Sequence, residues 1–169
     1  MTRIGIFSDT HGCTEPRLFD FFSSCDILFH AGDIGTMETA DEWSSFKPLM
    51  AVYGNIDGAD VRAVYPEIQR MNCEGVDILM THVGGYPGRY ERKIYHILKN
   101  DPPKLFITGH SHILKVMYDK TLQFLLINPG AMGNSGMHQV KTAVRLVVDG
   151  NNMKDLEIFE IPRKWENLF

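Results

Sequence analysis

Short apolar runs alternate with amphipathic stretches over the first third of the chain. The runs at residues 3–7, 27–30 and 49–53 predict buried strands, and each leads into a polar turn that contains glycine. Between the strands, Thr14 predicts the cap of a first helix, and residues 38–46 predict a second one. This alternation of strand and helix is typical of parallel strands joined by crossover helices.

The remainder of the chain is richer in strand patterns. A turn at residues 74–75 predicts a hairpin with a strand at 76–80, and residues 90–99 predict a helix that ends before two prolines. Five further strands are predicted at residues 105–108, 115–118, 123–128, 143–149 and 154–160, and the last four favour antiparallel pairing. We therefore expect an α/β fold of two packed sheets with helices outside, formed as a single domain by residues 1–169.

Composition narrows the class of protein. Hydrophobic residues make up 44% and charged residues 22%, as in soluble globular proteins. The net charge of −4 provides no basic surface for sequence-blind binding of nucleic acid. No apolar run approaches the roughly 20 residues that span a membrane, and no signal peptide is expected. Three cysteines without a Cys-x-x-Cys pair favour reduced thiols, so we expect a cytoplasmic protein.

Polar side chains gather where the predicted strands end. Because the carboxyl ends of parallel strands meet along one edge of a sheet, residues distant in sequence are expected to converge there. The candidates, in chain order, are Asp9, His11, Asp33, Asn55, Asp57, His82, His110 and His112. The sequence therefore predicts one site at this edge.

This combination of carboxylates, imidazoles and an amide oxygen suits divalent cations such as Mn²⁺, Fe²⁺, Zn²⁺, Co²⁺ or Ni²⁺. Four protein ligands nearly saturate one ion. Seven ligands that share one carboxylate can instead hold two ions roughly 3.5 to 4 Å apart, the arrangement used in two-metal hydrolysis.

Each motif also has a plainer interpretation. An Asp-x-His or a Gly-Asn pair, taken singly, is more typical of a turn than of a metal site. Two histidines one residue apart in a glycine turn, His110 and His112, indicate metal binding or catalysis. The other histidines, His30, His96 and His138, are predicted to be structural or surface residues.

Taken in order, these blocks resemble the calcineurin-like metallophosphoesterase superfamily. The blocks are Asp9-x-His11, Gly32-Asp33, Gly54-Asn55, His82 and Gly109-His110-x-His112. The small size, Gly54-Asn55-x-Asp57 and Asn128-Pro129-Gly130 are similar to the compact bacterial and archaeal phosphodiesterases of that superfamily. The resemblance implies a four-layer α/β/β/α sandwich of two mixed sheets flanked by helices.

The resemblance also implies how the ligands divide between two ions. One ion would be held by Asp9, His11, Asp33 and His112, and the other by Asp33, Asn55, His82 and His110, with Asp33 as the bridge. The catalytic candidates are Asn55, Asp57 and His82. The implied reaction is hydrolysis of a small phosphodiester by a hydroxide held between the ions. Mn²⁺ is the expected metal, with Ni²⁺, Zn²⁺, Fe²⁺, Co²⁺ and Mg²⁺ as alternatives.

One departure from the wider family concerns the leaving group. Ile56 stands where many members have a histidine that protonates it. We therefore expect either a preference for esters with stable leaving groups or another proton donor, such as water or Asp57. Asp57 could alternatively orient ligands or form a turn. Residues 84–90 predict a flap over the site, in which Arg89 either contacts phosphate or is solvated.

Two other functions stay open. A phosphomonoesterase or protein phosphatase would use the same metals in a pocket of another shape. A protein-binding scaffold, such as the retromer subunit of this fold, would not need to keep buried carboxylates and imidazoles, which are costly unless paired or bound to metal. The resemblance alone suggests a homodimer, and the segment with Trp165, Leu168 and Phe169 is expected to pack on the domain or on a partner subunit.

Overall fold

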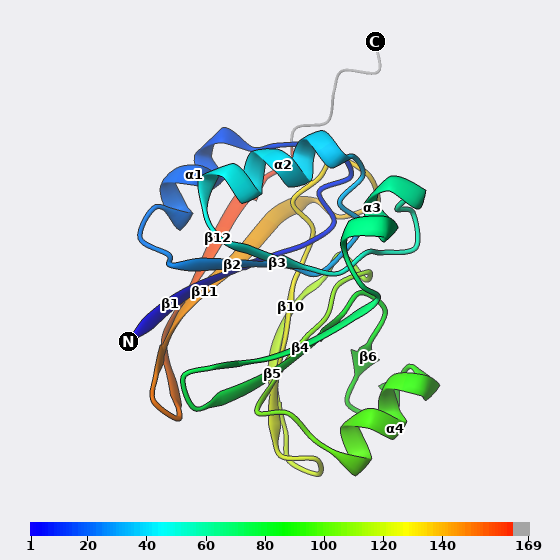
Figure 1. Ribbon diagram of the computed structural model, residues 1–169, viewed down its shortest axis with the longest axis vertical. Coiled ribbons are helices and arrows are strands. Elements are labelled where there is room, and N and C mark those ends of the chain that lie inside the picture. The colour runs from blue at the N-terminus through cyan, green and yellow to red at the C-terminus, as the bar shows by residue number, and fades with distance from the viewer. Residues whose placement is uncertain (164–169) are drawn as a thin grey trace.

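The computed structural model describes residues 1–163, which form two sheets with helices on their outer faces (Figure 1). The first half of the chain forms β1 (Thr2–Phe7), α1 (Pro16–Phe22), β2 (Ile27–His30), α2 (Met37–Phe46), β3 (Leu49–Ala51), α3 (Ala59–Val64), β4 (Ile68–Cys73) and β5 (Val76–Thr81). The second half forms β6 (Gly85–Tyr86), β7 (Arg89–Tyr90), α4 (Arg92–Asn100), β8 (Leu105–Ile107), β9 (Leu114–Asp119), β10 (Phe124–Pro129), β11 (Val140–Asp149) and β12 (Asn152–Pro162).

Both five-stranded sheets are mixed. The first has the order β12-β11-β1-β2-β3, in which β1, β2 and β3 run parallel and β11 lies antiparallel to β1 and β12. The second has the order β4-β5-β8-β10-β9, with β5, β8 and β10 parallel and antiparallel strands at both edges. The predicted parallel start and the antiparallel pairing of the last four strands are therefore confirmed.

The two sheets pack face to face through fully buried aliphatic and aromatic side chains. Ile6, Phe29 and Val144 from the first sheet join Met80 and Ile107 from the second in one apolar cluster. Burying a side chain of this size contributes roughly 1.5–3 kcal/mol each. This packing fixes the strand ends of the two sheets relative to each other.

The helices cover the outer faces of the two sheets. Trp43 of α2 and Phe22 of α1 belong to a cluster on the outer face of the first sheet. Ile94 and Leu98 of α4 pack on the outer face of the second sheet (Figure 1). These four layers confirm the α/β/β/α sandwich. Within residues 1–163, no helix is long and apolar enough to cross a bilayer.

Three local predictions differ from the structure. Thr14 does not cap α1: Glu15 does, through a hydrogen bond from the Arg17 N–H, while Thr14 Oγ1 donates to Glu42. The strand predicted at 49–53 ends at Ala51. The helix predicted at 90–99 begins at residue 92, because the Glu91 side chain accepts from Ile94 N–H as its cap. The segment with Trp165, Leu168 and Phe169 lies outside the described residues.

One helix and two short strands were not predicted. Helix α3 has only six residues, and its N-cap residue, Gly58, has no side chain that could cap it, so the sequence carries little local signal for this helix. Strands β6 and β7 have two residues each and form a separate hairpin within the predicted flap.

Candidate metal centre

The predicted site residues lie at the carboxyl ends of parallel strands from both sheets. Asp9 follows β1, Asp33 follows β2, Asn55 follows β3, His82 comes directly after β5, and His110 follows β8. Because the sheets pack face to face, five loops reach the same edge of the sandwich. The fold therefore brings together residues as far apart in sequence as Asp9 and His112, as the sequence predicts.

The first ligand group consists of Asp9, His11 and His112, whose ligand atoms lie within 4.8 Å of one another. Oδ1 of Asp9 lies 3.1 Å from Nε2 of His112 and 3.8 Å from Nε2 of His11. Asp9 is fully buried, while the two histidines are partly exposed. The group therefore faces solvent on one side.

The second group consists of Asp33, His82 and His110, also within 4.8 Å. Oδ2 of Asp33 lies 3.2 Å from Nε2 of His82. Oδ1 of Asn55 lies 3.0 Å from His82 Nε2 and 3.1 Å from His110 Nδ1. Asn55 thus adds a neutral oxygen between the two imidazoles.

Asp33 connects the two groups. Its Oδ2 atom, which faces His82, is also 3.5 Å from Nε2 of His11 in the first group. A carboxylate oxygen placed between both groups is the arrangement that a bridging ligand requires.

Unsatisfied polar atoms in the first group suit a cation. Oδ1 of Asp9 and Nε2 of His11 are buried and make no hydrogen bond within residues 1–163. Burying polar atoms without partners costs free energy, which metal coordination would recover. In the second group, His82 donates Nδ1–H to the Ala31 carbonyl oxygen at 2.7 Å, so that the neutral form of the ring directs its Nε2 lone pair at the cluster. The residues therefore fit divalent cations.

The charges of these groups are coupled. Burial acts to raise the pKa of Asp9, but His11 and His112 outweigh it, so the pKa lies well below its usual value. Burial also opposes ionisation of Asp33, yet His82 lowers the pKa of Asp33. Conversely, Asp9 raises the pKa of His11, and Asp33 raises that of His82 against the effect of burial. The carboxylates are thus held anionic, and protons compete with cations for the imidazoles.

Five ligand residues have an unusual backbone conformation. The φ angles are +54° at Asp9, +47° at His11, +56° at Asp33, +72° at His110 and +63° at His112. Residues with a Cβ atom rarely adopt this left-handed region. In the loops after β1, β2 and β8 it directs these five side chains toward the same edge.

Three of the ligands follow a glycine, because a larger residue at that position would clash with another part of the site. A Cβ at Gly32 would lie 2.7 Å from the His82 ring, and one at Gly54 would lie 2.0 Å from Asp33 Oδ1. A Cβ at Gly109 would lie 2.9 Å from Asp9 Oδ2. The Gly-Asp, Gly-Asn and Gly-His pairs of the sequence therefore leave room for a ligand from another loop.

Asp57 lies beneath the cluster. Its Oδ1 accepts from Gly35 N–H at 2.8 Å, and its Oδ2 accepts from Ile34 N–H at 3.1 Å and Gly54 N–H at 2.8 Å. Arg62 Nε donates to the Asp57 carbonyl at 2.7 Å. These contacts tie the Asn55 loop to the Asp33 loop. They favour the orienting role predicted for Asp57 over proton donation.

The three remaining histidines lie outside the two ligand groups. His30 is fully buried, where Nδ1 accepts from Gly32 N–H and Nε2 lies 2.9 Å from Thr10 Oγ1. His138 donates Nε2–H to the Gly133 carbonyl and packs against His112 with ring centroids 5.0 Å apart. His96 is exposed on α4. That the three have structural or surface roles stays a prediction.

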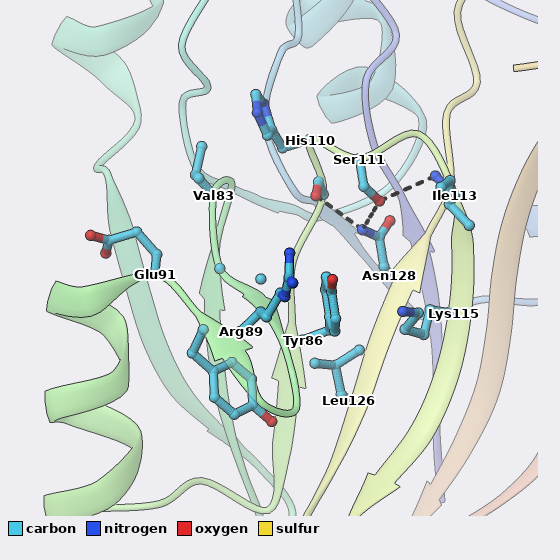
Figure 2. A pocket seen from close by; sticks show the side chains of 14 residues that line it. Val83, Tyr86, Arg89, Glu91, His110, Ser111, Ile113, Lys115, Leu126 and Asn128 are labelled. Atoms are coloured by element: carbon cyan, nitrogen blue, oxygen red, sulfur yellow. Dashed lines mark hydrogen bonds between the residues drawn. The ribbon is translucent and has the colours of Figure 1, made fainter. Parts of the chain in front are cut away.

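A cavity of about 320 Å³ adjoins the second ligand group (Figure 2). His110 lines both, and the β6–β7 hairpin forms one wall with Tyr86 and Arg89. Ser111 and Lys115 line the opposite side. The sequence pointed to Arg89, His110 and Asn128 of this lining, but not to Ser111 or Lys115. The available signals were the serine inside Gly-His-Ser-His and a lysine in the apolar 113–118 segment.

The fold and the site define a class of protein: an α/β/β/α sandwich with a two-part cluster of metal-ligating side chains at the strand ends. Residues 2–151 match the family model of the calcineurin-like phosphoesterase superfamily domain. The chain belongs to this superfamily.

Relatives and solved structures agree with this membership. The chain is 30% identical over 133 residues to a probable metallophosphoesterase of Methanocaldococcus jannaschii, covering 76% of this chain and 67% of the relative. A structure of mutant Vps29 from Entamoeba histolytica has a TM-score of 0.72 at 15% identity, covering 95% of this chain and 98% of the other. A structure described as a novel archaeal phosphodiesterase has a TM-score of 0.70 at 19% identity, covering 95% and 99%. At these identities the two structures show the shared fold alone.

Proposed function

We propose that this protein is a two-metal phosphodiesterase. The observation that carries the proposal is the position of Asp33 Oδ2 between His11 of one ligand group and His82 of the other. In the proposed centre, Asp9, His11, Asp33 and His112 hold one ion, and Asp33, Asn55, His82 and His110 hold the other. Mn²⁺ is the proposed metal, and imidazole and carboxylate donors also suit Zn²⁺, Fe²⁺, Co²⁺ and Ni²⁺.

When bound, two ions would lower the pKa of a water molecule and would offset negative charge on phosphoryl oxygens. Contacts within the protein hold the ligand side chains in position before a substrate binds. The Ala31 carbonyl orients His82, and Asp57 holds the Asn55 loop against the Asp33 loop. Asn55 is exposed at the front of the cluster, where its amide Nδ2 can donate to a phosphate oxygen without adding negative charge.

A phosphodiester is proposed rather than a monoester because the cavity beside His110 offers room for a second ester group. A monoester would leave this cavity unused. The alternative of a scaffold finds support in the fold of the Vps29 structures, but the unsatisfied atoms of Asp9 and His11 favour metal binding.

Hydrolysis of bis(p-nitrophenyl) phosphate and of p-nitrophenyl phosphate, measured side by side, tests the proposal. The protein is stripped with a chelator and reloaded with Mn²⁺, Ni²⁺, Zn²⁺ or Mg²⁺, and the bound metal is counted by elemental analysis. We expect two ions per chain and higher kcat/KM for the diester. His110→Ala should lose the activity and one ion, whereas the exposed control His96→Ala should retain both.

Other outcomes would change the assignment. A higher kcat/KM for the monoester would make the protein a phosphomonoesterase. One bound ion with full activity would contradict the two-metal mechanism. No bound metal and no hydrolysis of either ester would favour the scaffold.

A further inference from the structure

The cavity beside the metal centre lies between the β6–β7 hairpin and one end of the second sheet. One wall is the β6–β7 hairpin, and the other is formed by the loop after β8 and the start of β9 (Figure 2). His110 lies at its edge, so a group bound at the second ligand group would be continuous with the cavity. The space of about 320 Å³ is large enough for an ester substituent.

Two cations of this cavity have no acidic partner among residues 1–163. Lys115 makes a cation–π contact, with Nζ 4.0 Å from the centroid of the Tyr86 ring. Arg89 is exposed, and Figure 2 shows its guanidinium pointing from the hairpin toward the His110 loop. The chain has a net charge of −4, and several of its other cations form ion pairs with carboxylates. Among the described residues, Lys115 and Arg89 have no such pair and face the cavity.

The acidic residue that lines the cavity, Glu91, does not offset these charges. Its Oε2 accepts from Ile94 N–H at 3.1 Å, as the cap of α4. Figure 2 shows its carboxylate pointing away from Arg89, on the far side of the hairpin.

Ser111 adds a neutral donor. Its Oγ accepts from Asn128 Nδ2 at 2.9 Å and from Ile113 N–H at 3.2 Å (Figure 2). A hydroxyl oxygen has two lone pairs and one proton. Both lone pairs of Ser111 are therefore occupied, and its O–H is left to donate. In the described chain, no protein acceptor receives that proton.

We propose that this cavity is a subsite for an ester group that carries its own negative charge. Arg89 and Lys115 provide the attraction, Ser111 donates a hydrogen bond, and the buried Leu126 with the Tyr86 ring forms the apolar surface under the ester's body. The preferred substrate is then a phosphodiester with a second anionic group beyond the phosphate that is cleaved. This inference rests on the proposed phosphodiesterase function and specifies its substrate class.

A pair of non-hydrolysable ligands tests the subsite by binding alone. Diphenylphosphinate and (4-carboxyphenyl)phenylphosphinate differ by one carboxylate, and neither has an ester bond to cleave. Calorimetric Kd values are measured on the Mn²⁺-loaded protein. We expect the carboxylated ligand to bind about fivefold tighter to the native chain, as for a partly exposed ion pair. Raising the salt concentration should reduce this preference.

Three variants separate the subsite from a general charge effect. Lys115→Met and Arg89→Gln should each reduce the preference, taken as the ratio of the two Kd values within one variant, toward unity. Lys120→Met removes the same charge from the exposed β9–β10 turn and should keep the preference.

Hydrolysis of bis(p-nitrophenyl) phosphate is measured on the same samples, so that the two proposals can fail separately. Equal Kd values for the two phosphinates, or a preference that survives both cavity variants, would overturn the subsite even in an active phosphodiesterase. A preference lost in both variants would support the subsite, and inactivity toward the diester would then overturn only the proposed reaction.

Discussion

Gly54 lies against Asp33 so closely that a Cβ at position 54 would stand 2.0 Å from Asp33 Oδ1 and 2.4 Å from the Asp33 backbone nitrogen. The chain can avoid this overlap only by moving one loop away from the other. The pair therefore links a turn residue with no side chain to the carboxylate that joins the two ligand groups.

Gly54→Ala is expected to separate Asp33 from its neighbours. Overpacking of this kind costs roughly 1–3 kcal/mol of stability. Displacing a shared ligand should also weaken metal binding by at least about tenfold, as loss of a ligand-supporting contact does. Urea unfolding in chelator and calorimetric titration with Mn²⁺ measure the two effects.

Gly58→Ala is the matched control for this substitution. A Cβ at position 58 would lie 3.3 Å from Asp60 Oδ1, an exposed side chain that can move. If Gly54→Ala binds Mn²⁺ with the native affinity, the close contact between Gly54 and Asp33 does not position Asp33 for metal binding.

Asp57→Asn should destabilise the fold rather than remove a proton donor. The carboxylate accepts three backbone N–H groups, and an amide would direct N–H against at least one of them. We expect a loss of about 2–3 kcal/mol in the free energy of unfolding, measured in urea without metal. Asp60→Asn, on an exposed residue at the start of α3, is the control. Native stability combined with a lower kcat for alkyl esters would instead identify Asp57 as the acid.

The leaving group should strongly influence the rate. Ile56 is 47% exposed beside Asn55 and has no proton to donate. Alkyl phosphodiesters, whose alkoxide products are poor leaving groups, should therefore react far more slowly than p-nitrophenyl diesters. Ile56→His should raise kcat for an alkyl diester by at least about tenfold, because general acid catalysis contributes 10²–10⁴-fold. Similar kcat values for both ester types in the native protein would refute this expectation.

His30 should make the metal-free protein sensitive to acid. Burial lowers the pKa of His30 to about 4, against a usual value near 6.5. Between these values the unfolded chain binds a proton that the folded chain does not. The free energy of unfolding therefore falls as pH decreases from 6.5 to 4, by roughly 3 kcal/mol from this residue.

The structure explains why protonation of His30 is unfavourable. Nδ1 accepts from Gly32 N–H, so an added proton would face another donor. In His30→Gln, the dependence of stability on pH should become shallower over this interval, whereas the exposed His96→Gln should keep the native slope. Urea unfolding at several pH values in chelator gives these slopes, and equal slopes in all three proteins would rule the effect out.

Much of the fold could be predicted because its signals are local. Buried strands such as 27–30 are short apolar runs, and the residues after them are polar. The gathering of Asp9, Asp33 and His82 followed from the geometry of parallel strands. Their division into groups depended on the family resemblance, because distances between loops are not encoded locally.

The features that the sequence did not predict arise from contacts between distant segments. Thr14 has the right residue type for a cap, but its hydroxyl donates to Glu42 on α2. Helix α3 is too short to have a periodic pattern, and Val61 stabilises it through tertiary packing. The cavity depends on Tyr86 and Lys115 meeting from two elements 29 positions apart, which no local pattern predicts.

The left-handed backbone at five ligand residues affects which substitutions the chain tolerates in evolution. These residues are Asp9, His11, Asp33, His110 and His112. Each such residue with a Cβ costs roughly 1–2 kcal/mol relative to a relaxed conformation. Glycine at these positions would relieve that cost. A homologue that does not use these ligands could therefore gain folding stability when glycine replaces them. Stability alone would select against these five side chains. This backbone cost fits the proposed role of the five side chains as metal ligands.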